Sequence, residues 1–384
     1  MAIRPPRRTT LEGARAELAQ LVAPYASALE AAGVATDALA SGDDEALVAL
    51  YKAAHQPGVL PMPLRELLSE LDALATSAGA DAIDHVARQR GVVGLPASAT
   101  PAALAARARL LFPEIFAAAR VLVTAEAPAS THEHWPLRPG PVELPAGFDE
   151  ALRRAASEHF RGRRRSGYVE LLIVPRGDEI AIEVTRGDLR RDVTEIAEDD
   201  TRRQSRAVRP ARRDLVIVHR ATGMLSLCTA YPAERALYRR AMGALLHGDE
   251  EAYATSPTVR LAPLLGPMAT GPSVRAVRVT ELSLARPGQP DVRLRGATGL
   301  SAYLEGEEGR LVRRGARVTA AVIALDVAGE QRVRVELREP NVVRLGATDR
   351  GTEAVVRLYL ASRGVLVRPA PHALHADQRL GELA

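Results

Sequence analysis

Residues 168–185 read YVELLIVPRGDEIAIEVT. Two largely apolar runs in this stretch, Tyr168–Val174 and Glu179–Thr185, flank the turn signal Pro175-Arg176-Gly177-Asp178. Proline presets the backbone for a turn, and glycine accepts the positive φ that tight turns require. The pattern therefore predicts a β-hairpin, and with it antiparallel pairing in this part of the chain.

The surrounding sequence extends this hairpin into a domain. A second pair of runs, Asp214–His219 and Met224–Thr229, flanks Ala221-Thr222-Gly223 and predicts another hairpin. Amphipathic helical patterns stand before the first hairpin, at Phe148–Phe160, and after the second, from Pro232 to a stop signal at Gly248. The order helix, hairpin, charged connector, hairpin, helix predicts an α+β domain with mainly antiparallel strands.

Further strand patterns follow, and then a helix from about Thr352 to Arg363. Aliphatic and mostly arginine side chains alternate in the clearest of these runs, which is typical of a strand with one buried face. The expected strands are Val274–Leu284, Val292–Arg295, Val318–Val327, Arg332–Arg338 and Val342–Leu345.

The first part of the chain has helical periodicity instead. Leucines at positions 64, 67, 68, 71 and 74 fall on one helical face. A further helix is expected over Asp43–His55. Together these patterns predict a helical bundle ahead of the α+β portion.

These changes of pattern predict the domain organisation. We expect an acidic helical domain, a proline-rich linker, a basic α+β domain, a β-rich domain with a terminal helix, and a loose tail. The last two domains are possible subdomains of one α+β portion. The expected boundaries are 1–126, 127–147, 148–265, 266–368 and 369–384.

Charge divides along the same line. Residues 1–150 carry 12 basic and 18 acidic side chains, a net charge of −6, and residues 151–384 carry 39 and 29, a net charge of +10. Such asymmetry indicates separate tasks for the two parts. A basic part favours anionic partners, and a small acidic helical domain favours docking to a protein.

Two rare residues exclude several classes of protein. Lys52 is the single lysine and lies in a helical pattern without a glycine loop before it. P-loop nucleotide-binding proteins, pyridoxal enzymes and protein kinases all need a lysine in a defined place. Cys228 is the single cysteine, so neither an internal disulfide nor an all-cysteine metal site is possible.

Composition also bears on origin and location. An arginine- and alanine-rich, lysine-poor chain is typical of a high-GC bacterial genome. No secretory signal and no membrane span is expected, so the prediction is a cytoplasmic protein. No cofactor is predicted.

Two arginine clusters are the strongest candidate site. The first is the glycine-flanked run Arg161, Arg163, Arg164 and Arg165, which lies between a predicted helix and a strand. Guanidinium groups donate to two phosphate oxygens at once, and glycine lets the backbone approach. The second cluster lies in the connector between the hairpins, and we expect the two loops to meet at one edge of the sheet. Its members are Arg202, Arg203, Arg206, Arg209, Arg212 and Arg213.

Weaker candidates point to metal chemistry. His132 and His134 alternate in an extended segment, so both imidazoles face the same way and are candidate zinc ligands. Glu183, Asp188 and Asp214 stand at predicted strand ends, where paired acids bind magnesium in phosphodiesterases. Turn chemistry and pairing with arginine account for the same acids without catalysis.

The leading interpretation is a non-catalytic bacterial accessory or adaptor protein. Its basic half contacts nucleic-acid phosphates, and its helical half docks a protein partner. Few aromatic residues means few platforms on which unpaired bases stack, so contact with a duplex backbone is favoured. Two alternatives stay open: a metal-dependent phosphodiesterase or nuclease, and a purely structural protein–protein interaction subunit.

Overall fold

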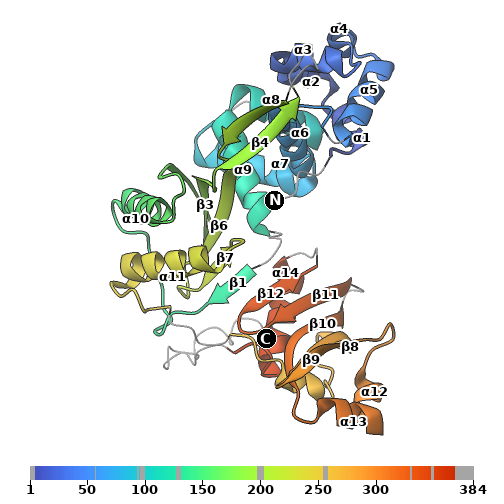
Figure 1. Cartoon of the computed structure of the whole chain (residues 1–384), viewed down its shortest axis with the longest axis vertical. Coiled ribbons are helices and arrows are strands. Elements are labelled where there is room, and N and C mark those ends of the chain that lie inside the picture. The colour runs from blue at the N-terminus through green and yellow to red at the C-terminus, as the bar shows by residue number, and fades with distance from the viewer. Residues whose placement is uncertain are drawn as a thin grey trace. The chain divides into compact units, whose positions relative to one another are not determined.

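A computed structural model describes residues 5–56, 58–92, 95, 100–126, 131–196, 203–253, 258–328, 331–346 and 350–367. It confirms the α+β class and the predicted order, in which helices come first and the antiparallel sheet follows (Figure 1). The segment 369–384, predicted to be a loose tail, lies outside the described residues.

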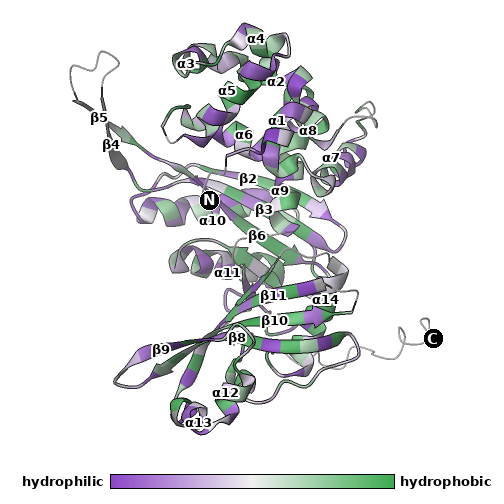
Figure 2. Cartoon of the chain, turned by 90° about the vertical axis from the view of Figure 1, so that its right-hand side faces the viewer, coloured by the Kyte–Doolittle hydropathy of each residue, from purple (hydrophilic) through white to green (hydrophobic). Residues whose placement is uncertain are grey.

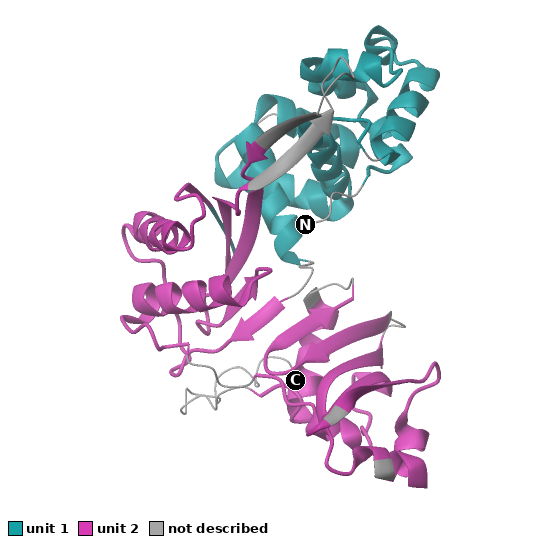
Figure 3. Ribbon diagram, in the orientation of Figure 1, with its two compact units in different colours: residues 1–126, 172–176 teal, residues 127–171, 177–384 magenta. Residues whose placement is uncertain are grey.

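The chain divides into two compact units, shown in Figure 3. Unit 1 comprises residues 1–126 together with Leu172–Arg176, and unit 2 comprises residues 127–171 and 177–384. Within unit 1, Gln89 donates to the carbonyl oxygen of Pro175 (3.1 Å), and Arg176 forms an ion pair with Glu126.

Unit 1 is built from helices whose leucine-rich faces pack together. The five leucines predicted to form a stripe lie on α6 and are all buried. Side-chain caps fix where three other helices begin: Asp43 accepts from the N–H of Glu45, Thr76 from Gly79, and Thr100 from Ala103. The helices are α1 (Arg8–Gly13), α2 (Arg15–Val22), α3 (Ala26–Ala31), α4 (Thr36–Ala40), α5 (Asp44–His55), α6 (Met62–Leu74), α7 (Ser77–Gln89), α8 (Pro101–Leu111) and α9 (Pro113–Glu126).

The sheet runs in the order β2-β3-β6-β7-β1-β12-β11-β10-β8-β9. Hydrophobic and hydrophilic residues alternate along the strand over Gln331–Arg338 (Figure 2), as expected where one face is buried, whereas residues 180–184 and 214–218 of two inner strands are all buried. Its strands are β1 (Thr131–His134), β2 (Val169–Arg176), β3 (Glu179–Gly187), β6 (Ala211–His219), β7 (Leu225–Cys228), β8 (Val274–Arg286), β9 (Gln289–Arg295), β10 (Arg317–Val327), β11 (Gln331–Arg338) and β12 (Val342–Leu345).

Both predicted hairpins form, and a glycine with positive φ occupies each turn. Gly177, at φ +56°, separates β2 from β3, and Gly223, at φ +72°, lies between β6 and β7. The flanking helices are α10 (Phe148–Gly162) and α11 (Pro232–His247). The predicted stop at Gly248 is confirmed, because this residue caps α11 at φ +69°.

Strands and helices also form where the sequence pattern did not predict them. The charged connector contains β4 (Arg191–Ile196) and β5 (Arg203–Val208), which pair with each other as a separate two-stranded sheet. Short helices α12 (Ser301–Glu305) and α13 (Glu307–Arg313) lie between β9 and β10. All four elements are short or highly charged, so no apolar periodicity marked them.

The segment predicted to be a linker contributes a strand to the sheet. β1 pairs antiparallel with β7 and with β12, and His132 is opposite Leu227 on one side and Val342 on the other. None of its four residues is proline, so every backbone N–H is free to donate. One sheet therefore runs through the segments 148–265 and 266–368, which the sequence suggested as separate domains.

The core of the C-terminal part lies between the sheet and the last helix, α14 (Arg350–Ser362). Ile323 on β10 and Val335 on β11 are fully buried, and so are Val356 and Leu360 on α14. The opposite face of these strands carries the arginines, as the alternation predicted.

A core substitution tests the packing of unit 1. Leu71 is fully buried, and Met62 on the same helix is 59% exposed. We expect L71A to lower the free energy of unfolding by about 2–5 kcal/mol, because it removes buried methyl groups and leaves a cavity. M62A is the control and should change it by less than about 0.5 kcal/mol in urea titrations. Equal effects of the two substitutions would contradict the described helix orientation.

Candidate nucleic-acid interface

The first arginine cluster forms a tight turn at the end of α10. The N–H groups of Arg163 and Arg165 both donate to the carbonyl oxygen of Phe160 (3.1 and 2.9 Å), and the N–H of Arg164 donates to Arg161 (3.0 Å). Arg164 has φ +58°, the left-handed conformation that side chains other than glycine adopt at a cost of about 1–2 kcal/mol. This winding sends Arg165 inward and leaves Arg161, Arg163 and Arg164 exposed.

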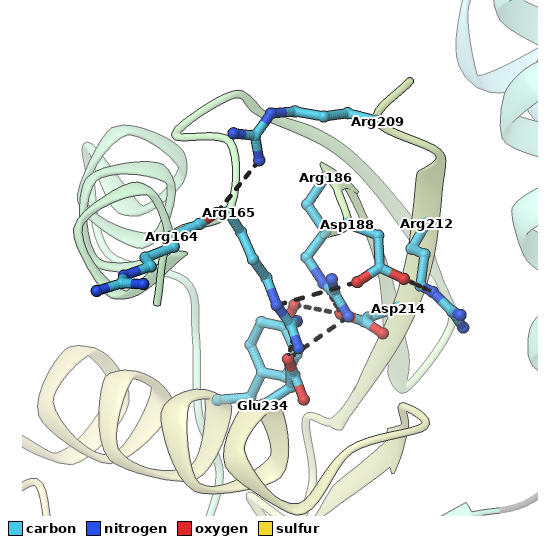
Figure 4. Close-up of polar contacts among 9 residues, drawn as sticks. Arg164, Arg165, Arg186, Asp188, Arg209, Arg212, Asp214 and Glu234 are labelled. Carbon is cyan, nitrogen blue, oxygen red and sulfur yellow. Dashed lines mark hydrogen bonds and ion pairs between the residues drawn. The ribbon is translucent and has the colours of Figure 1, made fainter. Parts of the chain in front are cut away.

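Arg165 is held by buried carboxylates (Figure 4). It forms an ion pair with Glu234 on α11, its Nε lies 3.9 Å from Asp188, and its guanidinium stacks over the ring of Tyr231 at 4.9 Å. Its side chain is only 10% exposed, and that of Glu234 is 0% exposed. Arg165 thus anchors the turn, and its guanidinium is already occupied.

The second loop meets the first. Arg209 is exposed, and its Nη1 donates to the carbonyl oxygen of Arg164 (3.3 Å), as Figure 4 shows. Arg212 forms an ion pair with Asp188, whose own N–H donates to the carbonyl oxygen of Pro210 (2.8 Å). Residues from the two predicted loops therefore lie side by side.

Three further arginines of the second cluster are Arg202, Arg203 and Arg206. Arg203 and Arg206 belong to β5, where they pair with Ile196 and Val193 of β4. Arg202 lies outside the described residues. We call the four exposed side chains Arg161, Arg163, Arg164 and Arg209 the loop surface.

A buried charge network lies beneath the loop surface. Arg186 on β3 is 0% exposed, and its Nε donates to Oδ2 of Asp214 on β6 (2.7 Å). The hydroxyl of Tyr238 on α11 donates to the same oxygen (2.9 Å), and Nη2 of Arg186 lies 3.7 Å from Glu234. The guanidinium also lies over the ring of Phe160, 4.8 Å from its centroid.

Burial and charge act together on the groups in this network. Burial, reinforced by the adjacent Asp214 carboxylate, raises the pKa of Tyr238 well above its ordinary value, so the phenol stays protonated as a donor. Burial lowers the pKa of Arg186, but the hydrogen bond and charge of Asp214, together with the charge of Glu234, outweigh burial and raise that pKa overall, so the guanidinium stays charged. The network is an ionised, hydrogen-bonded unit that joins β3, β6 and α11.

The three candidate catalytic acids all have arginine partners. Asp214 binds Arg186, Asp188 binds Arg212, and Glu183 lies 3.9 Å from Arg213. Burial raises the pKa of Asp188, but the N–H of Leu189 and the Arg212 guanidinium outweigh it and lower that pKa overall. Among the described residues, no group of three or more His, Cys, Asp or Glu side chains is placed to hold a metal ion.

The two candidate zinc ligands flank an asparagine. Asn341 contacts Nδ1 of His132 at 3.3 Å, and its amide nitrogen lies 3.1 Å from Nε2 of His134. Burial and the nearby Arg239 lower the pKa of His134 to about 3, and burial and Arg235 lower that of His132. Both imidazoles are therefore neutral at pH 7. The intervening Glu133 is bound by Arg357 instead.

Sequence reasoning missed the residues that hold the loop surface in place. Glu234 and Arg165 are 69 positions apart, and Arg186 and Asp214 are 28 apart. No local spacing connects such pairs. Arg235 and Arg239 were also missed, although their i,i+4 spacing on the predicted helix is a signal for one shared face.

Breaking the buried network tests its role. R186M leaves the Asp214 carboxylate buried without its guanidinium partner, and we expect the free energy of unfolding to fall by about 3–5 kcal/mol. R163Q, on the exposed turn, is the control and should change it by less than about 0.5 kcal/mol.

The double variant R186M/D214N removes the uncompensated charge and should recover part of the stability, measured by urea unfolding. A loss below about 1 kcal/mol for R186M would show that this network does not hold the three elements together.

In the described part of the chain, no helix combines the length and the apolar character that a membrane span requires. No known family model matches the chain, and no curated protein matches its sequence. The geometry of the arginine-bearing surfaces is therefore the basis for assigning a function.

Proposed function

We propose that this chain is a non-catalytic bacterial accessory protein that contacts the phosphates of a nucleic-acid duplex through the loop surface. The observation that carries this proposal is the meeting of two loops at the Arg209–Arg164 hydrogen bond, because these two loops bear the four exposed arginines of the loop surface. Within the described residues, none of the four forms an ion pair with a carboxylate. Their charge is available to an external anion.

The anchoring of the turn supports the same function. Arg165 and Arg212 are fixed by Glu234 and Asp188, so the neighbouring backbone is ordered before any ligand binds. Preorganised donors lose less conformational entropy on binding than mobile ones. Arg161 also lies against Gly167, where a β-carbon would come within 2.3 Å of its Nε. Glycine at that position lets the guanidinium lie across the turn.

Phosphate contact requires no reading of bases. An arginine guanidinium donates hydrogen bonds to two phosphate oxygens at once, and its binding releases counterions condensed on the nucleic acid. Aromatic residues make up 3% of the chain, which gives few platforms for stacking unpaired bases. Binding to a duplex backbone, without sequence specificity, suits these side chains best.

Salt dependence tests this proposal. In fluorescence titrations of the full chain with a short duplex, R163Q/R164Q should weaken binding. It should also reduce the slope of log K against log salt by about two, because two phosphate contacts are lost.

The matched control is R88Q/R90Q, which removes the same charge from exposed positions at the end of α7. It should leave both affinity and slope near those of the wild type. No binding at low salt, or equal slopes for the two variants, would overturn the proposal.

The helical unit takes the partner-docking role in the same proposal. Its support is the net charge of −3 over residues 1–126, which carry 11 basic and 14 acidic side chains, and the exposure of Met62 and Leu111, at 59% and 66%. An acidic surface with exposed apolar side chains suits a basic, partly apolar protein surface.

Carboxylate-directed cross-linking tests the docking role. The single lysine makes amine-directed reagents uninformative, so a dihydrazide reagent is used on the full chain in a lysate of its native host. Cross-links to a partner should fall on acidic residues before position 127. Mass spectrometry of the digested complex locates the cross-links. Partner cross-links found only after position 148 would contradict the assignment.

A further inference from the structure

A groove is lined by residues of α11, of β1 and of the arginine-bearing face of the sheet. Figure 1 labels these elements. The volume of the groove is about 910 Å³, and it lies wholly within unit 2. One wall is α11, with Arg235 and Arg239 one turn apart, and the other is β11, with Arg338. His132 and His134 of β1 line it together with Asn341.

Side-chain size on the sheet explains why this face is hollow. Ala320 and Val322 of β10 line the groove, and their cross-strand partners on β11 are Arg338 and Glu336. Small residues on β10 thus stand beside long charged ones on β11. Because cross-strand partners in an antiparallel pair lie about 5 Å apart, the long side chains of β11 stand along one side of a shallow depression over β10.

The groove has an excess of positive charge. Six arginines and three glutamates line it. The glutamates are already occupied: Glu281 binds Arg293 at 2.6 Å, Glu336 lies 3.5 Å from Arg344, and Glu339 binds Arg317 from outside the groove at 2.8 Å.

Three arginines remain without a carboxylate partner among the described residues. Arg235 donates to the carbonyl oxygen of Thr229 and Arg239 to that of Tyr253, both at 3.3 Å. These bonds orient the two guanidinium groups but leave their charge uncompensated. Arg338, on the opposite wall, is exposed. Two oriented guanidinium groups on one wall and an exposed arginine on the other thus line one cavity.

The floor of the groove is polar but uncharged. His134 and Asn341 are 6% and 8% exposed, and the two histidines are held neutral by burial and by the arginines above them. Asn341 already contacts both imidazoles, so only the ring nitrogens and amide groups left over from these contacts can donate to or accept from a ligand. This floor can bind hydroxyl or carbonyl groups of a ligand but adds no charge of its own.

We propose that this groove binds a small organic polyphosphate, with its phosphoryl groups between Arg235, Arg239 and Arg338 and its neutral part on the His132–Asn341–His134 floor. The volume lies in the range of about 300–1,000 Å³ that small-molecule sites occupy. Three guanidinium groups, each able to donate two hydrogen bonds, provide enough donors for two or three adjacent phosphoryl groups. Among the described residues that line the groove there is no Phe, Tyr or Trp, so recognition rests on the phosphates. The site is separate from the loop surface and does not depend on the proposed function.

Calorimetric titration of the full chain tests this inference, with inorganic tripolyphosphate, ATP and orthophosphate as probes. Tripolyphosphate and ATP should each bind one per chain, at least about tenfold tighter than orthophosphate, since more charge is neutralised at once. R338Q alters an exposed residue and should weaken both by about tenfold or more. R235Q should do the same from the opposite wall.

R240Q is the matched control, because Arg240 is exposed on α11 but does not line the groove. It should bind both probes within about twofold of the wild type. Absence of tripolyphosphate and ATP binding at low salt, or equal affinities for R338Q and R240Q, would overturn the inference.

Duplex titrations separate this site from the loop surface. R338Q should leave duplex affinity unchanged, and R163Q/R164Q should leave tripolyphosphate affinity unchanged. If R338Q loses duplex binding while no small phosphate binds, the groove belongs to a nucleic-acid footprint and the polyphosphate inference is wrong. If R163Q/R164Q loses tripolyphosphate binding, the ligand sits at the loop surface, and the inference is equally wrong.

Discussion

The buried pairing of Arg165 and Arg186 with Glu234, Asp188 and Asp214 is the constraint on which the basic half depends. It joins the end of α10 and strands β3 and β6 to α11, in surroundings that exclude most water. Charges in such surroundings are tolerated only when each has a partner, and removing one partner leaves the other uncompensated. The positions of the two arginine loops therefore follow from ion pairs beneath them.

One consequence is a division of labour among neighbouring arginines. The Arg165 guanidinium is engaged in holding the turn, whereas Arg163 and Arg164, two positions and one position earlier, remain exposed. The left-handed backbone at Arg164 separates the two orientations. Identical side chains in one short run thus have different roles, and their count in the sequence overstates the charge that faces a ligand.

Helix α11 links the two basic surfaces. Glu234 and Tyr238 point into the buried network, and the residues that follow each of them, Arg235 and Arg239, line the groove. Successive helical residues are about 100° apart, so one helix can serve two environments. Because nearly all basic residues are arginines, both surfaces present planar, permanently charged groups suited to phosphate oxygens.

The sequence by itself determined the element types and much of their order, since strand alternation, helical periodicity and turn glycines are local signals. Gly177, Gly223, Gly248 and the leucine stripe of α6 lie where those signals indicated. Only the tertiary structure decided which arginines are free, that β1 joins the sheet, and that a groove forms beside α11. The physical reason is distance along the chain: pairs such as Arg165 with Glu234, or His134 with Asn341, meet through packing that no local pattern encodes.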